Sequence, residues 1–205
     1  MPAAQARSGN SEVRPVFVFA ADANKLVVKQ LLSEEQIREG VSRLAAEVAR
    51  RYGGRPLTVV GVLTGSLVLL ADLIRLLDLP LRVGVIQTRS YRGAATLPGA
   101  LDIDRGMLPD MKNEDVLLVD DIFDTGRTLT AVVDEVRALE PRSIRTAVLL
   151  LKSGRQATRF RPDYVAFEIP DGFVVGYGLD YQDRYRHLPY VAVLEPDDLI
   201  PGARP

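Results

Sequence analysis

The stretch VLLVDDIFDTGRTLTAV, residues 116–132, decides the fold. Its first four residues are apolar, as expected of a strand that is buried on both faces of a sheet. Asp120, Asp121 and Asp124 follow, and Thr-Gly-Arg-Thr comes directly after them, where a helix is predicted to begin. A tight turn from a buried strand into a helix points backbone amides outward, and such amides bind anions. The stretch therefore predicts an α/β fold with a phosphate site in this turn.

Three aspartates beside a phosphate site require an explanation, because carboxylates repel phosphate. At an effective dielectric constant near 20, a carboxylate about 6 Å from a phosphate charge is opposed by roughly 3 kcal/mol. The arrangement becomes favourable when sugar hydroxyls or a hard cation such as Mg²⁺ lie between the two. The alternative is an acidic turn in which Thr125 only caps the helix, which is the commoner use of aspartates before a helix. The position after a buried strand and the density of carboxylates favour a phosphorylated sugar with a metal nearby.

Strands and helices alternate along the rest of the chain. Apolar runs predict strands at residues 26–32, 57–63, 81–90, 116–120, 143–151, 164–169 and 173–179, and helical spacing predicts helices at 37–52, 67–79 and 128–139. The first helix has a capping box at Ser33 and Gln36 and ends at Gly53. This order predicts a parallel sheet with ligands at the carboxyl ends of its strands, where the polar turns TGS, DDIFDTGRT and KSGR lie. Residues 91–113 are predicted to form an exposed loop with room for one short strand.

The composition excludes several classes of protein. With 205 residues, 47% of them apolar and 26% charged, the chain is predicted to form one globular domain, 25–200, preceded by a flexible tail, 1–24. A net charge of −1 provides no basic field to hold nucleic acid. The chain has no cysteine and a single histidine, His187, which excludes disulfides and multi-histidine metal sites. No apolar run is long enough to span a membrane or form a signal peptide, so a cytoplasmic protein is expected.

Four segments resemble one known family. VLLVDDIFDTGRTL resembles the motif by which type I phosphoribosyltransferases bind 5-phosphoribosyl 1-pyrophosphate (PRPP). GVLTGSLVLLADL, RSYRG and FEIPDGFVVGYGLDYQDRYRHLPYVAVL are similar to the pyrophosphate loop, the start of the mobile loop and the purine-binding C-terminus of the hypoxanthine/guanine branch. The resemblance covers roughly residues 26–195, and its C-terminal block is the most discriminating part.

The resemblance implies both a fold and an activity. The fold would be a central, mainly parallel sheet flanked by helices, with a small hood formed by the N- and C-terminal segments. The activity would be purine salvage, in which the 5-phosphoribosyl group of PRPP is transferred to the 6-oxopurine hypoxanthine or guanine, giving IMP or GMP and pyrophosphate. The cofactor would be Mg²⁺. Family members are commonly dimers or tetramers, so a homodimer or homotetramer is expected by resemblance only.

The resemblance also implies roles for individual residues. Asp120 and Asp121 would hold the ribose hydroxyls of PRPP and, with Asp180, would support Mg²⁺. Asp124 would be the general base that faces N7 of the purine. The 5′-phosphate would be held by Asp124, Thr125, Gly126, Arg127 and Thr128, pyrophosphate by Leu63, Thr64, Gly65 and Arg186, and the purine by Lys152, Phe173, Val174 and Asp180, with Ser90 and Tyr91 in the mobile loop.

Two residues depart from the family pattern. The first acidic position of the PRPP motif is usually glutamate and is Asp120 here, so a shorter side chain reaches for one ribose hydroxyl. The pyrophosphate loop often has a basic residue where this chain has Thr64, which leaves the backbone to bind pyrophosphate. The family also implies a cis peptide after Leu63.

Several of these residues have an ordinary structural interpretation as well. Phe173 could be a core aromatic, Lys152 a solvated residue at a strand end, and Asp180 the partner of a nearby arginine. Tyr91 could be incidental on an exposed loop. For the turn after residue 120, the functional interpretation is clearly favoured over the structural one.

Two alternative functions remain open from the sequence. A regulator with the same fold could sense PRPP or nucleotides and bind RNA, but the neutral charge balance and the purine-type C-terminus argue against it. A sister transferase could prefer xanthine, because base preference depends on the pocket around Lys152, Val174 and Asp180.

Overall fold

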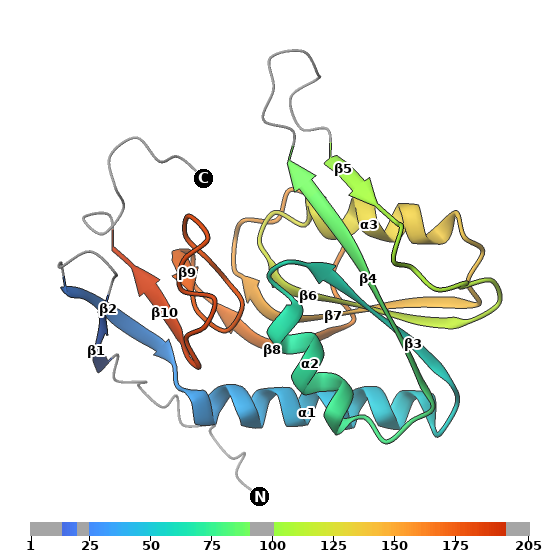
Figure 1. Cartoon of the computed structure of the whole chain (residues 1–205), viewed down its shortest axis with the longest axis horizontal. Coiled ribbons are helices and arrows are strands. Elements are labelled where there is room, and N and C mark those ends of the chain that lie inside the picture. The colour runs from blue at the N-terminus through green and yellow to red at the C-terminus, as the bar shows by residue number, and fades with distance from the viewer. Residues whose placement is uncertain (1–13, 20–24, 91–100, 196–205) are drawn as a thin grey trace, which may run out of the picture.

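The computed structural model describes residues 14–19, 25–90 and 101–195. Within these residues the chain forms two β-sheets and a set of flanking helices (Figure 1). The strands are β1 (Arg14–Phe19), β2 (Lys25–Leu32), β3 (Leu57–Leu63), β4 (Leu81–Ser90), β5 (Leu101–Asp104), β6 (Asp115–Phe123), β7 (Ser143–Lys152), β8 (Tyr164–Ile169), β9 (Phe173–Val175) and β10 (Val191–Leu194). The helices are α1 (Glu34–Tyr52), α2 (Leu67–Leu76) and α3 (Arg127–Arg137).

The larger sheet has the strand order β5-β4-β3-β6-β7-β8 in the described part of the chain. The pairs β4·β3, β3·β6, β6·β7 and β7·β8 are all parallel, and β5 is antiparallel to β4 at one edge. The predicted central, mainly parallel sheet is therefore confirmed. Because these strands run the same way, the turns that follow β3, β6 and β7 meet at one edge of the sheet.

The helices cover both faces of this sheet (Figure 1). Along β6, Leu117 and Val119 pack with residues of α1 and α2, while Val116 and Leu118 pack on the opposite face with residues of α3. Since alternate side chains of a strand point to opposite faces, both sets are buried, which explains the continuous apolar run. α1 begins with the predicted capping box at Ser33 and ends at Gly53 in the left-handed conformation.

The smaller sheet, together with the segment that joins β9 to β10, forms the predicted hood. The sheet has the strand order β1-β2-β10-β9, and every pair of neighbouring strands in it is antiparallel. It lies beside the carboxyl-end edge of the larger sheet (Figure 1). β2 was predicted as the first strand of the alternating series, but it pairs with the C-terminal β10 and not with the larger sheet.

The region predicted as a tail contains a strand. β1 pairs with β2 over six residue pairs, from Arg14 opposite Gln30 to Phe19 opposite Lys25, while residues 1–13 and 20–24 lie outside the described residues. The division into a tail, 1–24, and one domain, 25–200, remains a prediction. Within the described residues, no helix has both the length and the apolar character needed to cross a membrane.

Candidate active site

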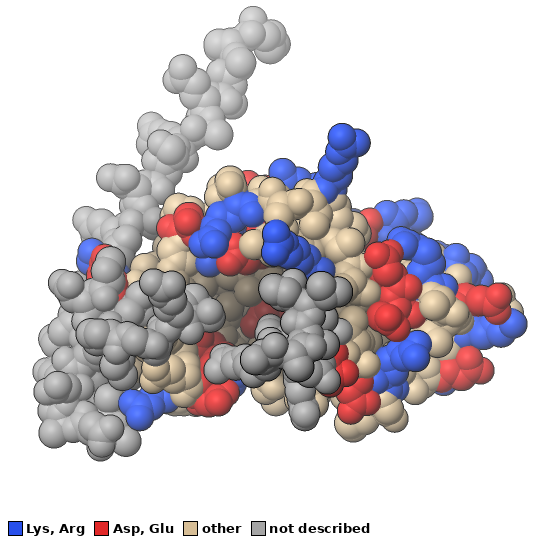
Figure 2. Space-filling model, turned by 90° about the horizontal axis from the view of Figure 1, so that it is seen from above, with Lys and Arg blue, Asp and Glu red and all other residues tan. Residues whose placement is uncertain are grey.

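The turns after β3 and β6 enclose a cavity at the carboxyl-end edge of the larger sheet. The cavity has a volume of about 320 Å³. Every residue predicted to bind ribose or the 5′-phosphate lines it except Arg127, and Leu63 and Gly65 of the predicted pyrophosphate turn line it as well. Thr64 is not among the lining residues. Seen from above, the molecule is hollowed on one face, with acidic and basic side chains around the hollow (Figure 2).

The turn between β6 and α3 has the geometry of a phosphate cradle. Gly126 is the N-cap of α3 with φ of 83°, a conformation that favours glycine. A Cβ at this position would come within 2.5 Å of the Phe123 ring and 2.7 Å of Thr158 Oγ1. α3 has no acidic residue in its first turn, and the first amides of a helix have no intrahelical acceptor. The turn therefore offers donors and a favourable helix dipole to an anion.

Asp120 and Asp121 form a pair of adjacent carboxylates at the end of β6. Asp120 is only 6% exposed, and its Oδ1 accepts a hydrogen bond of 3.0 Å from the Asp121 amide. Asp121 Oδ1 accepts one of 2.8 Å from the Ile122 amide. Burial raises the pKa of both carboxyl groups, and for Asp120 the neighbouring Asp121 raises the pKa further. The pair is therefore poised to bind hydroxyl donors or a cation. β6 extends to Phe123, so these carboxylates lie on the strand itself and not in the turn.

The predicted pyrophosphate turn packs directly against this pair. The Leu63–Thr64 peptide is cis, as the resemblance implied. A Cβ on Gly65 would lie 1.6 Å from Asp121 Oδ2, so only glycine fits there without moving the carboxylate. A Cβ on Gly178 of the hood would lie 2.1 Å from the Gly65 carbonyl oxygen. The turn is thus enclosed between Asp121 and the hood.

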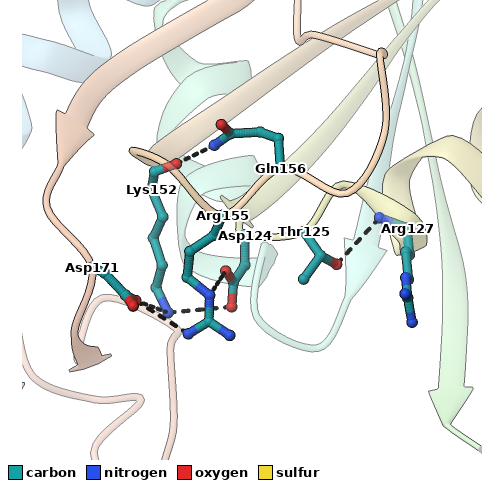
Figure 3. Close-up of polar contacts among 7 residues, drawn as sticks. All are labelled: Asp124, Thr125, Arg127, Lys152, Arg155, Gln156 and Asp171. Carbon is teal, nitrogen blue, oxygen red and sulfur yellow. Dashed lines mark hydrogen bonds and ion pairs between the residues drawn. The ribbon is translucent and has the colours of Figure 1, made fainter.

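Lys152 and Asp124 lie together at the ends of β7 and β6 (Figure 3). The Lys152 side chain is 9% exposed, and its Nζ donates to Asp124 Oδ2 at 3.3 Å. Two residues that the sequence reasoning did not assign join them, namely Arg155 and Asp171. The polar turn KSGR at the end of β7 was the sequence signal for Arg155.

The other predicted purine residues lie in the hood. Phe173 contacts the Tyr181 ring edge-on, with 5.3 Å between ring centroids. The Val174 side chain is buried in the core, so only its backbone can face a ligand. Asp180 Oδ1 pairs with Arg186 at 2.8 Å, which is one of the structural interpretations considered above. The 320 Å³ cavity is not lined by any of the four residues Phe173, Val174, Asp180 and Arg186.

Arg186 contacts the part of the hood that packs against the predicted pyrophosphate turn. It donates to the Gly178 carbonyl oxygen at 2.8 Å, and its positive charge counteracts the rise in the pKa of Asp121. It also lines a second cavity of about 630 Å³ between α1, α2 and the hood. Of the predicted mobile-loop residues, Ser90 ends β4 with its backbone opposite Leu101, and Tyr91 lies outside the described residues.

The chain is similar to phosphoribosyltransferases along most of its length. Residues 27–182 match the family described as "Phosphoribosyl transferase domain". A hypoxanthine-guanine phosphoribosyltransferase of Staphylococcus aureus is 37% identical over 167 residues, which are 82% of this chain and 93% of the relative. The bifunctional protein TilS/HprT of Listeria innocua is 36% identical over 83% of this chain, and there the chain spans only 26% of the relative's length.

Two solved structures that are similar to this chain carry the same kind of name as the Staphylococcus aureus relative. A hypoxanthine-guanine phosphoribosyltransferase of Bacillus anthracis superposes with a TM-score of 0.76 at 34% identity, covering 81% of this chain and 98% of that one. The hypoxanthine phosphoribosyltransferase of Trypanosoma cruzi gives a TM-score of 0.77 at 36% identity, with coverage of 82% and 92%. The fold of this chain is therefore shared with these structures over about four fifths of its length.

Proposed function

This chain belongs to the hypoxanthine-guanine phosphoribosyltransferase family, and we propose that it transfers the 5-phosphoribosyl group of PRPP to a 6-oxopurine with release of pyrophosphate. One observation carries the proposal. A buried carboxylate pair, a glycine-containing turn at a helix N-terminus and a glycine-containing cis-peptide turn enclose a single cavity. The carboxylate pair suits the ribose hydroxyls, the helix N-terminus suits the 5′-phosphate, and the backbone of the cis-peptide turn would receive the pyrophosphate of PRPP.

The turn from Asp124 to Thr128 would hold the 5′-phosphate. The N-terminus of α3 contributes a dipole effect of about 0.3–1 kcal/mol, so hydrogen bonds from the backbone amides and from Thr125 and Thr128 would provide most of the binding. Asp120 and Asp121 would accept hydrogen bonds from the two ribose hydroxyls. The sugar would then be fixed with C1′ toward the purine and pyrophosphate sides of the cavity.

Asp120 and Asp121 fit a site for Mg²⁺. Among the described residues no group of three or more acidic or histidine side chains is arranged to hold a metal, so the ion would need substrate oxygens as further ligands. The two buried carboxylates with raised pKa would gain from a neighbouring cation. Bound Mg²⁺ would supply positive charge that stabilises the leaving pyrophosphate. Asp180 supports this role less well, because its carboxylate is paired with Arg186.

Asp124 and Lys152 would act on the purine. Breaking the bond between C1′ and pyrophosphate should develop oxocarbenium character at the sugar, as in glycosyl transfer generally. Asp124 would accept the proton from N7 of the purine as the purine attacks C1′, and Lys152 would donate a hydrogen bond to the exocyclic oxygen of the purine. Phe173 would stack on the ring and the Val174 backbone would contact its edge. Arg186 and the Leu63–Gly65 turn would hold pyrophosphate, and the segment that begins at Ser90 and Tyr91 would exclude water.

An assay of hypoxanthine, guanine, xanthine and adenine with PRPP and Mg²⁺ tests the proposal and separates the xanthine-preferring alternative. Turnover should be found with hypoxanthine or guanine. The variant Asp124→Asn should lower turnover about 100-fold while PRPP binding changes by no more than about threefold, because the amide cannot accept a proton. Unchanged turnover in this variant would remove Asp124 from the mechanism.

Three finer points complete the proposal. The Staphylococcus aureus relative and both solved structures reported above are named phosphoribosyltransferases, which favours an enzyme over the RNA-binding regulator. A homodimer or homotetramer in the cytoplasm remains a prediction from the resemblance. Gel filtration with light scattering would determine the oligomeric state, and a salt-dependent RNA shift assay should show no specific binding.

A further inference from the structure

Four charged side chains form one network beside the carboxyl ends of β6 and β7 (Figure 3). Lys152 and Arg155 contribute two positive charges, and Asp124 and Asp171 contribute two negative charges. Arg155 Nε lies 3.1 Å from Asp124 Oδ1, and Arg155 Nη1 lies 3.1 Å from Asp171 Oδ1. Lys152 Nζ lies 3.3 Å from Asp124 Oδ2 and 4.0 Å from Asp171 Oδ1. Arg155 therefore bridges Asp124, at the end of β6, and Asp171, between β8 and β9.

The two carboxylate oxygens of Asp124 have different partners. Oδ2 accepts a hydrogen bond from Lys152, the side chain expected to move to the purine oxygen. Oδ1 is buried and has no hydrogen bond within the described part of the chain, so the ion pair with Arg155 is what compensates its charge. If the Lys152 ammonium moved to the purine oxygen, Oδ2 of Asp124 would become available to N7, and Arg155 would remain as the cation paired with Asp124.

The backbone holds Arg155 in place. Gly154 has φ of 80° and turns the chain immediately after β7. On either side of Arg155, the Ser153 amide donates to the Ile169 carbonyl at 2.9 Å, and the Gln156 side chain donates to the Lys152 carbonyl. The Ala157 amide donates to the Thr125 carbonyl at 2.9 Å, which ties this loop to the phosphate turn. The guanidinium is therefore presented to Asp124 by a loop that is anchored to the site.

We propose that Arg155 is a positioning residue for the general base: it holds Oδ1 of Asp124, so that Oδ2 is aimed at the purine. The inference rests on the proposed function, since it assigns the roles of Asp124 and Lys152 from it. Asp171 is the second anchor, because it fixes the far side of the guanidinium. Its pKa is lowered by the hydrogen bond from Arg155, which agrees with a formed ion pair.

A merely structural ion pair predicts something different. The Arg155 side chain is 45% exposed, and ion pairs of such exposure contribute little to the stability of a fold. Removing it should therefore leave the unfolding midpoint almost unchanged. If Arg155 positions Asp124, its removal should instead change the chemistry of that carboxyl group. The charged groups nearest Asp124 are Lys152, Arg155 and Asp171, and the carboxylates of Asp120 and Asp121 line the same cavity as Asp124.

The test compares Arg155→Gln, Arg155→Lys and Asp171→Asn with the wild-type chain. Arg159→Gln, an exposed arginine of the same loop, is the matched control. In Arg155→Gln the acidic limb of kcat/KM for hypoxanthine should move up by about one pH unit, as expected when a cation within 4–6 Å of a carboxylate is lost. On the acidic limb itself kcat/KM should fall roughly tenfold, and above the limb it should change little, while the Kd for PRPP should stay within about twofold. Arg155→Lys should recover part of the loss, and Asp171→Asn should lower kcat/KM less than Arg155→Gln does, because the guanidinium loses only one of its two anchors.

A second readout keeps this inference separate from the proposed function. Carbon-13 NMR of the Asp124 carboxyl group, assigned by its loss in Asp124→Asn, follows the ionisation without any turnover. The resonance should titrate at higher pH in Arg155→Gln than in the wild-type chain and in Arg159→Gln. An unchanged titration in Arg155→Gln would overturn the inference. A weaker binding of PRPP together with a lower unfolding midpoint in this variant would overturn it as well. Absence of transferase activity in the wild-type chain would overturn the proposed function, while the NMR result would still decide whether Arg155 controls Asp124.

Discussion

At the scale of single residues, Asp120 and Asp121 are proposed to bind the substrate, and their burial opposes stability. Two adjacent buried carboxylates with raised pKa are costly to a ligand-free protein. The same pair becomes favourable when ribose hydroxyls and a cation reach it. Such a cost is typical of active sites, where groups are arranged for a ligand rather than for the fold.

Replacing Asp120 by asparagine should stabilise the ligand-free protein. The amide carries no charge and can donate to Asp121, so the free energy of unfolding at neutral pH should rise by about 0.5–2 kcal/mol. The pKa of Asp120 in the fold is raised above 3.8, so its ionised form destabilises the fold above that raised pKa. This penalty disappears as the pH falls through the folded pKa toward 3.8. The advantage of Asp120→Asn should therefore shrink in acid.

Urea unfolding between about pH 5 and pH 8 measures this difference. Asp134→Asn on the exposed side of α3 serves as the control and should show no such trend. The affinity of Asp120→Asn for PRPP should fall about tenfold, since a charged acceptor for a ribose hydroxyl is lost. A variant that is less stable than the wild-type chain at neutral pH would contradict this view of the carboxylate pair.

Gly65 is the described glycine at which the site leaves the least room for a side chain. In Gly65→Ala the new Cβ would occupy the place of Asp121 Oδ2, and the flexible carboxylate would have to move away. We expect a folded protein whose PRPP affinity is lowered roughly tenfold or more, by misplaced ribose contacts. Isothermal titration with PRPP measures the loss. Gly172→Ala is the control, because its Cβ would meet Val193 at an ordinary 3.6 Å.

The arrangement of residues 120–128 was predictable because these residues are consecutive in the sequence. Asp120 to Thr128 lie within one strand–turn–helix unit, so local pattern and chemistry indicate their function. Arg155 was not assigned, because its partners Asp124 and Asp171 come from other elements. The polar KSGR turn marked its position, but only the three-dimensional arrangement gives its partners.

At the scale of elements, periodicity predicted what each segment becomes but not always where it lies. The apolar runs 57–63, 81–90 and 164–169 coincide with β3, β4 and β8. The run 26–32 also forms a strand, yet it pairs with β10 from the other end of the chain. An apolar strand carries no local mark of its partner, since pairing is decided by contacts distant in sequence. The run predicted at 173–179 ends as a strand at Val175, because Gly176 and Gly178 have positive φ.

The contact between α2 and the hood gives a testable link between elements. Tyr177 Oη donates to Asp72 Oδ2 at 2.6 Å, and burial together with this bond raises the pKa of Tyr177. Tyr177→Phe should lower the free energy of unfolding by about 1–2 kcal/mol, since it leaves Asp72 without this donor. Thermal and urea unfolding measure the change, and Tyr190→Phe on a half-buried hood position is a suitable comparison. Unchanged stability in Tyr177→Phe would show that this bond does not hold the hood to α2.

At the scale of the whole molecule, the proposed site draws on two sheets that come from different parts of the chain. Asp120, Asp121, the turn after β6 and Lys152 belong to the larger sheet, and the proposed purine contacts Phe173 and Val174 lie on β9 of the hood. The sequence predicted this architecture through its resemblance to a family. Alternation of strands and helices alone predicted the parallel sheet but not the separate hood, whose strands are short and distant in sequence.

Binding of PRPP should stabilise the whole molecule in a metal-dependent way. A ligand at 100 times its Kd raises the free energy of unfolding by about 2.7 kcal/mol. PRPP with Mg²⁺ should therefore raise the melting temperature, and the same PRPP with a chelator should raise it clearly less. Differential scanning fluorimetry measures both shifts, with ribose 5-phosphate as a control that lacks pyrophosphate. Equal shifts with and without Mg²⁺ would argue against a metal on Asp120 and Asp121.

The central claim is that the turn between β6 and α3 seats the 5′-phosphate while the adjacent carboxylates hold the ribose. A crystal structure of the complex with PRPP and Mg²⁺ tests it most directly. We expect phosphate density within hydrogen-bonding distance of the amides from Asp124 to Thr128, with the ribose hydroxyls on Asp120 and Asp121. A 5′-phosphate bound at any other part of the molecule would contradict it.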